Sequence, residues 1–354
     1  MTANRPQRPQ PSSRPNRPVQ ANSDLAETTV PKPYALVAFP NQPPKLEHPI
    51  GHDRFRADRL HGTIDLTLKV QTAVHISTGI VALGEDVKQR TPLIKTMIQG
   101  NNQTLMIPGS SLKGVVRSAY EAITNSTLAV VTRRYKDQIP DRRLPCRDQK
   151  QLCPASRVFG ALDWQGLVHF ADAKCEKAES VTGFMPSLYR PRPDQRKAYF
   201  VSGKAAGRKF YYHAVKAVSG GDRGIPVQQA GTEYTFSTQL HFKNLTAAEL
   251  GALFIVLGQD DKYPMALKVG GGKPIGMGTL TVTLKTIERV QNLRDRYTSY
   301  QIPDTDRLTE NALQKFVAEM IQAAHKELVL SEQLQQLAEI LQWPTNRTAP
   351  EGMY

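Results

Sequence analysis

The sequence predicts an α+β protein with a ferredoxin-like βαββαβ core, a basic insertion and a C-terminal helical extension. Two patterns predict this class. Four segments are typical of strands, two of them with clear alternation of apolar and polar residues, and two further segments are typical of helices. Along the chain their order is strand, helix, strand, strand, helix, strand. This is the ferredoxin-like order, which RRM-like RNA-recognition modules also use.

The first unit of the core begins with a strand. Residues 62–77 alternate apolar and polar side chains over a long run, and a polar loop is expected over residues 79–92. A proline–glycine pair then breaks the chain. The segment 110–123 places its apolar residues on one helical face, and Ser110 or Ser111 can cap this helix.

The second unit continues the pattern. Residues 166–173 are typical of a short strand, and residues 232–242 alternate cleanly. Residues 246–258 predict a capped apolar helix. The segment 269–278 is a glycine-rich turn that leads into the last strand, residues 279–287.

Three segments surround or interrupt this core. Residues 1–50 are rich in Pro, Gln, Asn and Arg without hydrophobic periodicity, so we expect a flexible arm. The core domain is expected over residues 51–300, with a Pro-, Gly- and Arg-rich insertion at about 181–225. Residues 301–354 predict two amphipathic helices.

Charge indicates the class of partner. The 354 residues include 46 Lys and Arg against 32 Asp and Glu, which gives a net charge of +14. A chain this basic favours a nucleic-acid partner, because neutralising phosphates releases counterions; a charge that serves only solubility is the alternative. No apolar run is long enough to span a membrane, and the N-terminus lacks a signal-peptide apolar region. Three cysteines exclude a disulfide-built scaffold, so a cytoplasmic protein is expected.

The string IPGSSLKGVVRSAYE predicts an anion site. Ser110 and Ser111 open a helix whose free N–H groups suit a phosphate, and Lys113 and Arg117 share one face beside them. An ordinary capped helix with two solvated cations is the alternative. The spacing of Ser110 and Lys113 also matches a serine-acylase pattern, but the S-D-N and K-T-G strings that such enzymes need are absent from the sequence.

The glycine-rich segment 270–278 allows close backbone approach to a ligand. It is not a phosphate-binding Walker loop, because Pro274 follows the lysine. We expect an RNA-backbone contact at Gly271, Gly272 and Lys273, with a tight structural turn as the alternative.

Three strings in order, IPGSSLKG, CPASRVFG and GGGKPIGMG, resemble the RAMP superfamily, the repeat-associated mysterious proteins of CRISPR systems. The resemblance covers about residues 60–290 and is greatest to the backbone subunits of type III effector complexes. It implies binding of a CRISPR guide RNA and its complementary target RNA, and assembly with other effector subunits. The string GRKFYYH (207–213) also resembles one in longer, multi-domain members.

The resemblance also assigns roles to the basic insertion. A protruding thumb would kink the guide–target duplex with an apolar wedge at Phe184, Met185 and Tyr189. A basic loop that becomes ordered on binding is the alternative. The residues expected to hold RNA backbone are Arg157, Arg190, Arg192, Lys204, Arg208 and Lys209.

In type III backbone subunits an aspartate after the first strand cuts the target RNA, and Asp86 matches it. The 2′-hydroxyl attacks its own phosphate, and a carboxylate of pKa ~3.9 is a weak base. Asp86 is therefore expected to hold Mg²⁺ or Mn²⁺ or to orient the sugar. Glu85 beside it leaves the registration open by one residue.

Two other functions stay open. One is a structural RNA-binding subunit without chemistry. The other is the guide-processing endoribonuclease of the same superfamily, for which His61, His75 and His213 are the candidates, although no pair is marked by its spacing.

The three cysteines, Cys146, Cys153 and Cys175, lie within 30 residues, which suggests a shared site. Members of the family that the chain resembles often bind structural zinc around the string that is CPASRVFG in this sequence, but Ser156 stands where their pattern has a further cysteine. His169 or another histidine could complete the site. Three buried or free thiols are the alternative.

Overall fold

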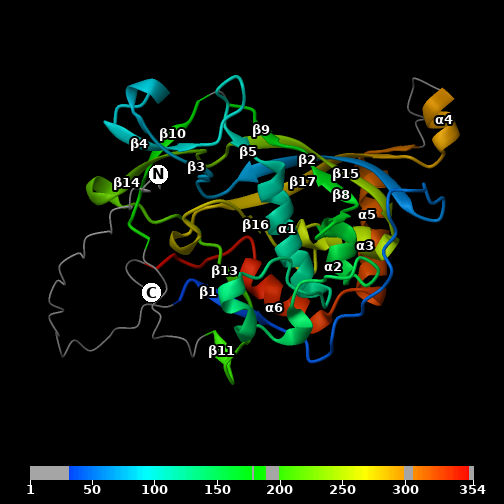
Figure 1. Cartoon of the computed structure of the whole chain (residues 1–354). Helices are drawn as coiled ribbons and strands as arrows, with labels where there is room; N and C mark the ends of the chain where they lie inside the picture. Colours follow the sequence, from blue (N-terminus) through cyan, green and yellow to red (C-terminus); the bar gives the residue numbers. More distant parts are fainter. Residues whose placement is uncertain (1–31, 178, 189–198, 299–305, 351–354) are drawn as a thin grey trace, which may run out of the picture.

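An antiparallel sheet of eight strands carries the core of the protein (Figure 1). The computed structural model describes residues 32–177, 179–188, 199–298 and 306–350. Across the sheet the order is β16, β17, β2, β15, β9, β5, with β18 paired to β17 and β8 to β15. The strands are β2 (Leu60–Val70), β5 (Met106–Ile107), β8 (Val168–Phe170), β9 (Ala173–Cys175), β15 (Thr235–Leu245), β16 (Leu267–Lys268), β17 (Thr279–Arg289) and β18 (Arg307–Leu308).

Alternation along the central strands decides which face is buried. On β2, Ile64 and Leu68 are at most 1% exposed, and in the register of the pair Leu68 lies opposite Phe236 of β15. Burying each such side chain stabilises the fold by about 1.5–3 kcal/mol. The alternate residues of β15, such as Gln239 and His241, are exposed, so this face of the sheet is polar.

The described helices other than α4 gather on the apolar side of the sheet, and α4 stands apart from them (Figure 1). Helix α3 begins with a capping box between Thr246 and Glu249, and a Cβ at Gly251 would lie 1.8 Å from the Met320 carbonyl oxygen of α5. This glycine lets the two helices pack closely. The helices are α1 (Gly109–Ile123), α2 (Pro154–Phe159), α3 (Ala247–Val256), α4 (Leu293–Thr298), α5 (Glu310–Glu327) and α6 (Ser331–Leu341).

The start of α1 differs from the prediction. Pro108 occupies the N-cap position and has no side chain that can cap, so the predicted caps at Ser110 and Ser111 are wrong. The Gly109 N–H donates to Asp172 Oδ1 at 2.8 Å. Helix α1 therefore begins one residue earlier, where the aspartate after β8 takes over the role of the cap.

A second, four-stranded sheet has the order β10, β14, β4, β3. Strands β3 and β4 form a hairpin, so the polar loop predicted for residues 79–92 is wrong at residues 79–83, which belong to β3; residues 84–92 connect the two strands. The residues of β3 are almost all exposed, so the sequence lacks the alternation that marks a half-buried strand. The strands are β3 (Ser77–Leu83), β4 (Leu93–Met97), β10 (Val181–Met185) and β14 (Ile225–Gln229).

Part of the predicted N-terminal arm is a strand. Residues 34–38 form β1 (Tyr34–Ala38), which pairs with β13 (Gly207–Tyr211) and buries Val37 to 1% exposure. The buried Arg143 also donates to the carbonyl oxygens of Pro40 and Gln42. The expected flexibility is therefore wrong from residue 34 to residue 42, because the partners of this segment lie far away in the sequence.

The two predicted C-terminal helices cover the core. Helix α5 packs on α3, and α6 packs on α1 and β1. Among the described helices, none is both long enough and apolar enough to cross a bilayer. The remaining elements are β6 (Gly160–Ala161), β7 (Trp164–Gln165), β11 (Phe200–Val201), β12 (Lys204–Ala205), and the 3-10 turns η1 (Glu85–Val87), η2 (Arg133–Gln138), η3 (Asp141–Arg143), η5 (Gly221–Arg223) and η6 (Lys273–Ile275).

Candidate nucleic-acid interface

Helix α1 presents a stripe of small residues to solvent. Ser110, Gly114 and Ser118 are exposed at successive four-residue steps, and Lys113 and Arg117 lie half-buried beside them. A Cβ at Gly114 would meet no heavy atom of the chain within 4 Å. A glycine inside a helix is about 1 kcal/mol less favourable than alanine, and nothing in the packing of this chain requires it here. The stripe therefore leaves room for close approach by a partner.

The charge on this stripe comes mainly from Lys113. Burial, and to a lesser extent Arg117, lower the pKa of Lys113 from its ordinary value of 10.5. Arg117 also faces inward, because its Nε lies 2.8 Å from Glu121 Oε1. A phosphate placed over the stripe would favour the charged form of Lys113.

Arg208, predicted to hold RNA backbone, is buried instead. Its side chain is 8% exposed, and Nη1 lies 2.7 Å from Glu121 Oε2. Nη2 donates to the carbonyl oxygens of Ser126 and Thr127, both at 2.9 Å. Of the two basic residues in the string GRKFYYH, Arg208 thus fixes β13 to α1 and to the segment that follows it, and its side chain is buried.

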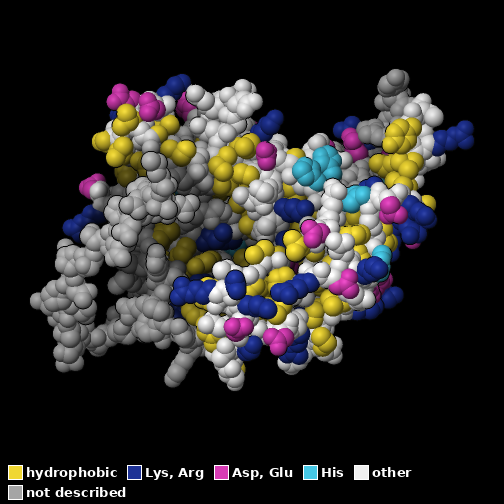
Figure 2. Space-filling view, viewed as in Figure 1, with side chains coloured by type: hydrophobic (Ala, Val, Ile, Leu, Met, Phe, Trp, Pro, Cys, Tyr) yellow, Lys and Arg dark blue, Asp and Glu magenta, His cyan; other side chains and the backbone are white. Residues whose placement is uncertain are grey.

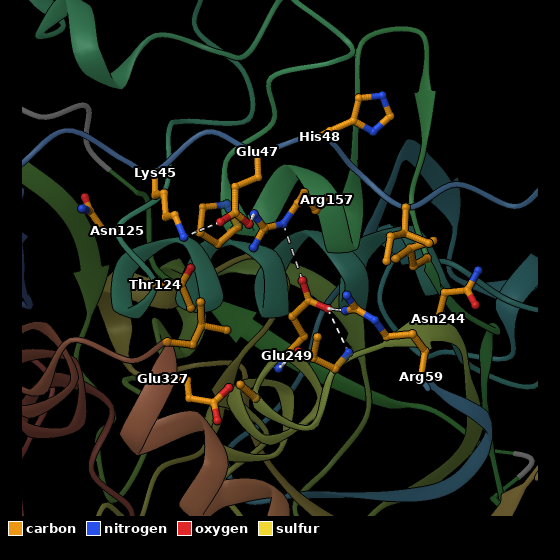
Figure 3. Close-up of a pocket in the computed structure, with 16 residues that line it drawn as sticks. Lys45, Glu47, His48, Arg59, Thr124, Asn125, Arg157, Asn244, Glu249 and Glu327 are labelled. Carbon is orange, nitrogen blue, oxygen red and sulfur yellow. Dashed lines mark hydrogen bonds and ion pairs between the residues drawn. The ribbon is translucent and has the colours of Figure 1, made fainter. Parts of the chain in front are cut away.

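Arg157 is likewise engaged by the chain itself. Figure 3 shows it between Glu47 and Glu249, with Lys45 and Arg59 at the two ends of the row. This row of ion pairs lines a cavity of about 350 Å³. The Lys45 ammonium and the Arg157 guanidinium hold the pKa of Glu47 below its usual value. Arg157 therefore ties the N-terminal segment to helix α3.

The glycine-rich segment forms a tight turn against the chain. The Gly271 N–H donates to the His75 carbonyl oxygen at 2.8 Å, and a Cβ at Gly272 would lie 2.5 Å from Met277 Sδ. Burial lowers the pKa of Lys273. Gly271 is exposed, so of the three residues predicted to contact RNA it is the most accessible.

Asp86 and Glu85 lie exposed in η1, at the turn between β3 and β4. A hydrogen bond ties this turn to β10, because the Thr182 hydroxyl donates to the side-chain oxygen of Gln89. Apolar residues of the hairpin are exposed around it, and Figure 2 shows apolar and acidic side chains together at this end of the molecule. The apolar residues are Ile80, Val81, Leu83 and Leu93.

The predicted wedge and the glycine-rich segment share a cavity. Phe184 and Met185 of β10, together with Met277, line a space of about 360 Å³ that Thr182 also borders. Phe184 is 38% exposed. The structure thus brings the wedge and the glycine turn to one cavity, and Thr182 links that cavity to the turn that carries Asp86.

Two further residues of the insertion that were predicted to hold RNA, Lys204 and Lys209, do not line this cavity. Lys204 donates to the carbonyl oxygens of Asp137 and Ile139. The ammonium of Lys209 lies 3.8 Å from the ring centroid of Tyr34, and burial lowers its pKa to about 8. Tyr189, Arg190 and Arg192 lie outside the described residues.

Two of the three cysteines form a pair. The Thr127 hydroxyl lies 3.2 Å from Cys153 Sγ and 3.5 Å from Cys146 Sγ, and the Cys153 N–H donates to Cys146 Sγ. Cys175 lies on β9 opposite Phe236. Among the described side chains, no group of three or more His, Cys, Asp or Glu residues is arranged to hold a metal ion. The pair supplies two thiols, whereas a structural zinc site has four ligands.

The histidines divide into two groups. His61, His75 and His213 are at most 5% exposed, and each ring hydrogen-bonds a backbone carbonyl, so they stabilise the interior. His169, named as a possible zinc ligand, instead stacks on His241 with ring centroids 6.0 Å apart. Both lie exposed on the polar face of the main sheet. Alternation along β15 is enough to predict that His241 faces this side, but it says nothing of His169.

Comparison with known proteins identifies the family. The family model of the RAMP superfamily matches residues 67–281, more than half of the chain. No curated protein matches the sequence. The match includes β3 to β16 and the whole of α1, so it covers the stripe, the turn with Asp86 and the glycine-rich segment. The chain belongs to the RAMP superfamily.

Proposed function

We propose that the protein is a guide-RNA-binding backbone subunit of a type III CRISPR effector complex, acting in the cytoplasm with other effector subunits. Membership of the RAMP superfamily indicates a CRISPR-associated, RNA-binding function. The observation that carries the proposal is the stripe on α1. It combines an open glycine, two exposed serines and the Lys113 ammonium within the string that carries the family resemblance.

The order of the strands supports a ferredoxin-like core for this function. Numbered along the chain, the four principal strands are β2, β8 with β9, β15 and β17. Across the sheet their order is β17, β2, β15, and then β8 with β9, which is the order 4-1-3-2 in terms of position along the chain. Each strand is antiparallel to its neighbour. We infer that α1 and α3 are the two crossover helices of a split βαβ arrangement.

A salt titration tests RNA binding at α1. Replacing Lys113 by Gln should weaken binding of unrelated single-stranded RNAs alike, because phosphate contacts carry no base information. The slope of log K against log salt should fall by about 0.7, the value for one phosphate contact. Lys315→Gln on the exposed face of α5 is the matched control and should leave the slope unchanged. An unchanged slope for the Lys113 variant would remove α1 from the RNA site.

We further propose that Asp86 takes part in cutting target RNA. Its support is position: the side chain is exposed on a turn held against β10, beside the cavity with Phe184 and Met185. A wedge that kinks the strand there would turn a 2′-hydroxyl towards its own phosphate. When bound, Mg²⁺ or Mn²⁺ would stabilise charge on the phosphate oxygens. Asp86 and Glu85 are the side chains of this turn that could hold the ion.

A scaffold without chemistry is the main alternative, and cleavage of complementary RNA by the assembled complex separates the two. Regular cuts in the target would support Asp86, and an intact target would support the scaffold. Processing of a repeat-stem precursor by the chain alone would favour the guide-processing branch. The burial of His61, His75 and His213 gives that branch no support at the predicted residues.

Zinc at the cysteines stays a proposal. Elemental analysis should find about one zinc per chain if Cys146 and Cys153 bind it with ligands from elsewhere, and Cys153→Ser should then lose it. Stoichiometry near zero would leave a hydrogen-bonded pair of thiols.

A further inference from the structure

A cavity of about 420 Å³ opens beside α1, on the side of Arg117. Its other walls come from the irregular segment 129–147 and from Ala161 and Leu162. Figure 2 shows Lys and Arg side chains in a row across the middle of the face on which α1 lies. In the sequence, the segment 129–147 is marked by its basic residues and by Cys146, one of the three cysteines of the suggested shared site.

The lining of this cavity is cationic. It includes Arg117, Arg133, Lys136 and Arg147, and no Asp or Glu is among its lining residues. Arg117 is paired with Glu121, whereas in the described part of the chain no ion pair forms at the other three, which are all exposed. Like charges gathered in one hollow repel each other, and an anion placed among them relieves that repulsion.

The cavity also has an apolar wall. Val131, Leu144 and Leu162 contribute to it, and Leu162 is 74% exposed. The volume lies within the range of about 300–1,000 Å³ found for small-molecule sites. A phosphate alone would use the cations and leave this wall uncovered, whereas a nucleotide would use both.

We propose that this cavity binds one nucleotide of single-stranded RNA, with its phosphate at Arg133, Lys136 and Arg147 and its sugar and base on the apolar wall. The proposal rests on the RNA-binding function proposed above. It gives the RNA a second contact next to the stripe on α1, because Arg117 lies beside the stripe and also lines the cavity. The RNA that passes along the stripe on α1 continues into this cavity.

Cys146 provides a built-in reporter. Its thiol lines the cavity and is partly exposed, while Cys153 and Cys175 are 0% and 7% exposed. In zinc-free protein, a thiol reagent should therefore reach Cys146 first among the three. RNA seated in the cavity should shield it.

Charge removal gives the first test, with a fluorescent oligouridylate as the probe and the full chain as the protein. The triple variant Arg133→Gln, Lys136→Gln, Arg147→Gln should weaken binding and lower the salt slope by about 0.7, since the cavity holds one phosphate and each phosphate contact contributes ~0.7. The control triple Lys285→Gln, Lys315→Gln, Lys326→Gln removes the same charge from exposed positions elsewhere. Equal losses in the two triples would overturn the cavity, because only total charge would then matter.

Labelling of Cys146 by N-ethylmaleimide, followed by mass spectrometry, gives the second test. RNA should slow labelling in the unmodified chain and have no effect in the cavity triple. If Lys113→Gln weakens binding while the cavity triple does not, and RNA leaves the labelling rate unchanged, the cavity proposal fails and the proposed function stands. If the unmodified chain binds no RNA at low salt, both fail.

Discussion

Arg208 of β13 and Glu121 of α1 form a buried ion pair, with 2.7 Å between Nη1 and Oε2. The two residues are 87 positions apart in the sequence. Two carbonyl oxygens at the end of α1 complete the coordination of the guanidinium. This pair explains why the string GRKFYYH contains a strongly basic residue without placing it on the RNA surface.

Arg208→Ala should destabilise the protein strongly. Removing one partner of a buried pair leaves the other charge uncompensated, which costs about 3–5 kcal/mol. Urea unfolding of the full chain measures the change. Arg223→Ala, at an exposed residue of the same insertion, is the control and should change the free energy of unfolding by less than ~0.5 kcal/mol. A similar small change for Arg208→Ala would show that the pair does not hold β13 to α1.

Substitutions at Gly114 should change stability and RNA binding in opposite directions. Gly114→Ala and Gly114→Leu should each stabilise α1 by about 1 kcal/mol, because the added side chain meets nothing and helix propensity improves. Leucine should also obstruct the stripe and weaken RNA binding, more than alanine does. Thermal unfolding and fluorescence anisotropy measure the two effects. Ala318→Leu, at an exposed position of α5, should change neither; RNA binding that tolerates Gly114→Leu would contradict close approach.

Asp86→Asn should abolish target cleavage at the position of this subunit while guide binding and assembly stay normal. The side chain is exposed and supports no part of the core, so stability should change by less than ~0.5 kcal/mol. Gel analysis of labelled target RNA measures the cuts, and Glu85→Gln shows whether the neighbouring carboxylate also takes part. Chelation of divalent metal should reproduce the Asp86 variant. If Asp86→Asn cuts normally, the assignment passes to Glu85 or the chain is a scaffold.

Lys268 should make stability depend on pH. It is buried beneath the glycine-rich turn, donates to the Gly276 carbonyl oxygen, and burial together with Lys273 lowers its pKa to about 7. Between pH 7 and pH 10.5, the ordinary pKa of lysine, Lys268 is protonated in the unfolded chain and neutral in the folded one. The free energy of unfolding should therefore rise with pH in this range, by at most ~1.4 kcal/mol per pH unit. Lys268→Met should remove this rise, as unfolding free energies across that range would show. Parallel pH profiles for the two proteins would mean that Lys268 stays charged when buried.

Local pattern was sufficient for the three long strands of the main sheet and for two of the helices. Alternation predicts β2, β15 and β17, because each has one buried face; helical spacing predicts α1, and a capped apolar run predicts α3. It fails at β3, which buries almost nothing, and at β1, whose partner β13 lies far along the chain. These strands depend on pairing, which a single sequence does not encode locally.

The candidate site could also be predicted only where its residues are contiguous in the sequence. The helix with Lys113 could be predicted because its motif is contiguous, and the turn with Asp86 could be located by its place after the first strand. The ion pairs of Arg208 and Arg157 could not be predicted, since each depends on carboxylates supplied by distant elements. Gly114 was visible as a helical glycine, but its open surroundings required the structure.

The RNA that co-purifies with the native protein tests the central claim most directly. Purification at low salt, extraction of nucleic acid and sequencing should yield a defined population of guide-length RNAs that share repeat-derived sequence. The same preparation of Lys113→Gln should retain less of it, because one phosphate contact is missing. Native protein that is free of nucleic acid at low salt, or that carries only random cellular RNA, would contradict a guide-binding role.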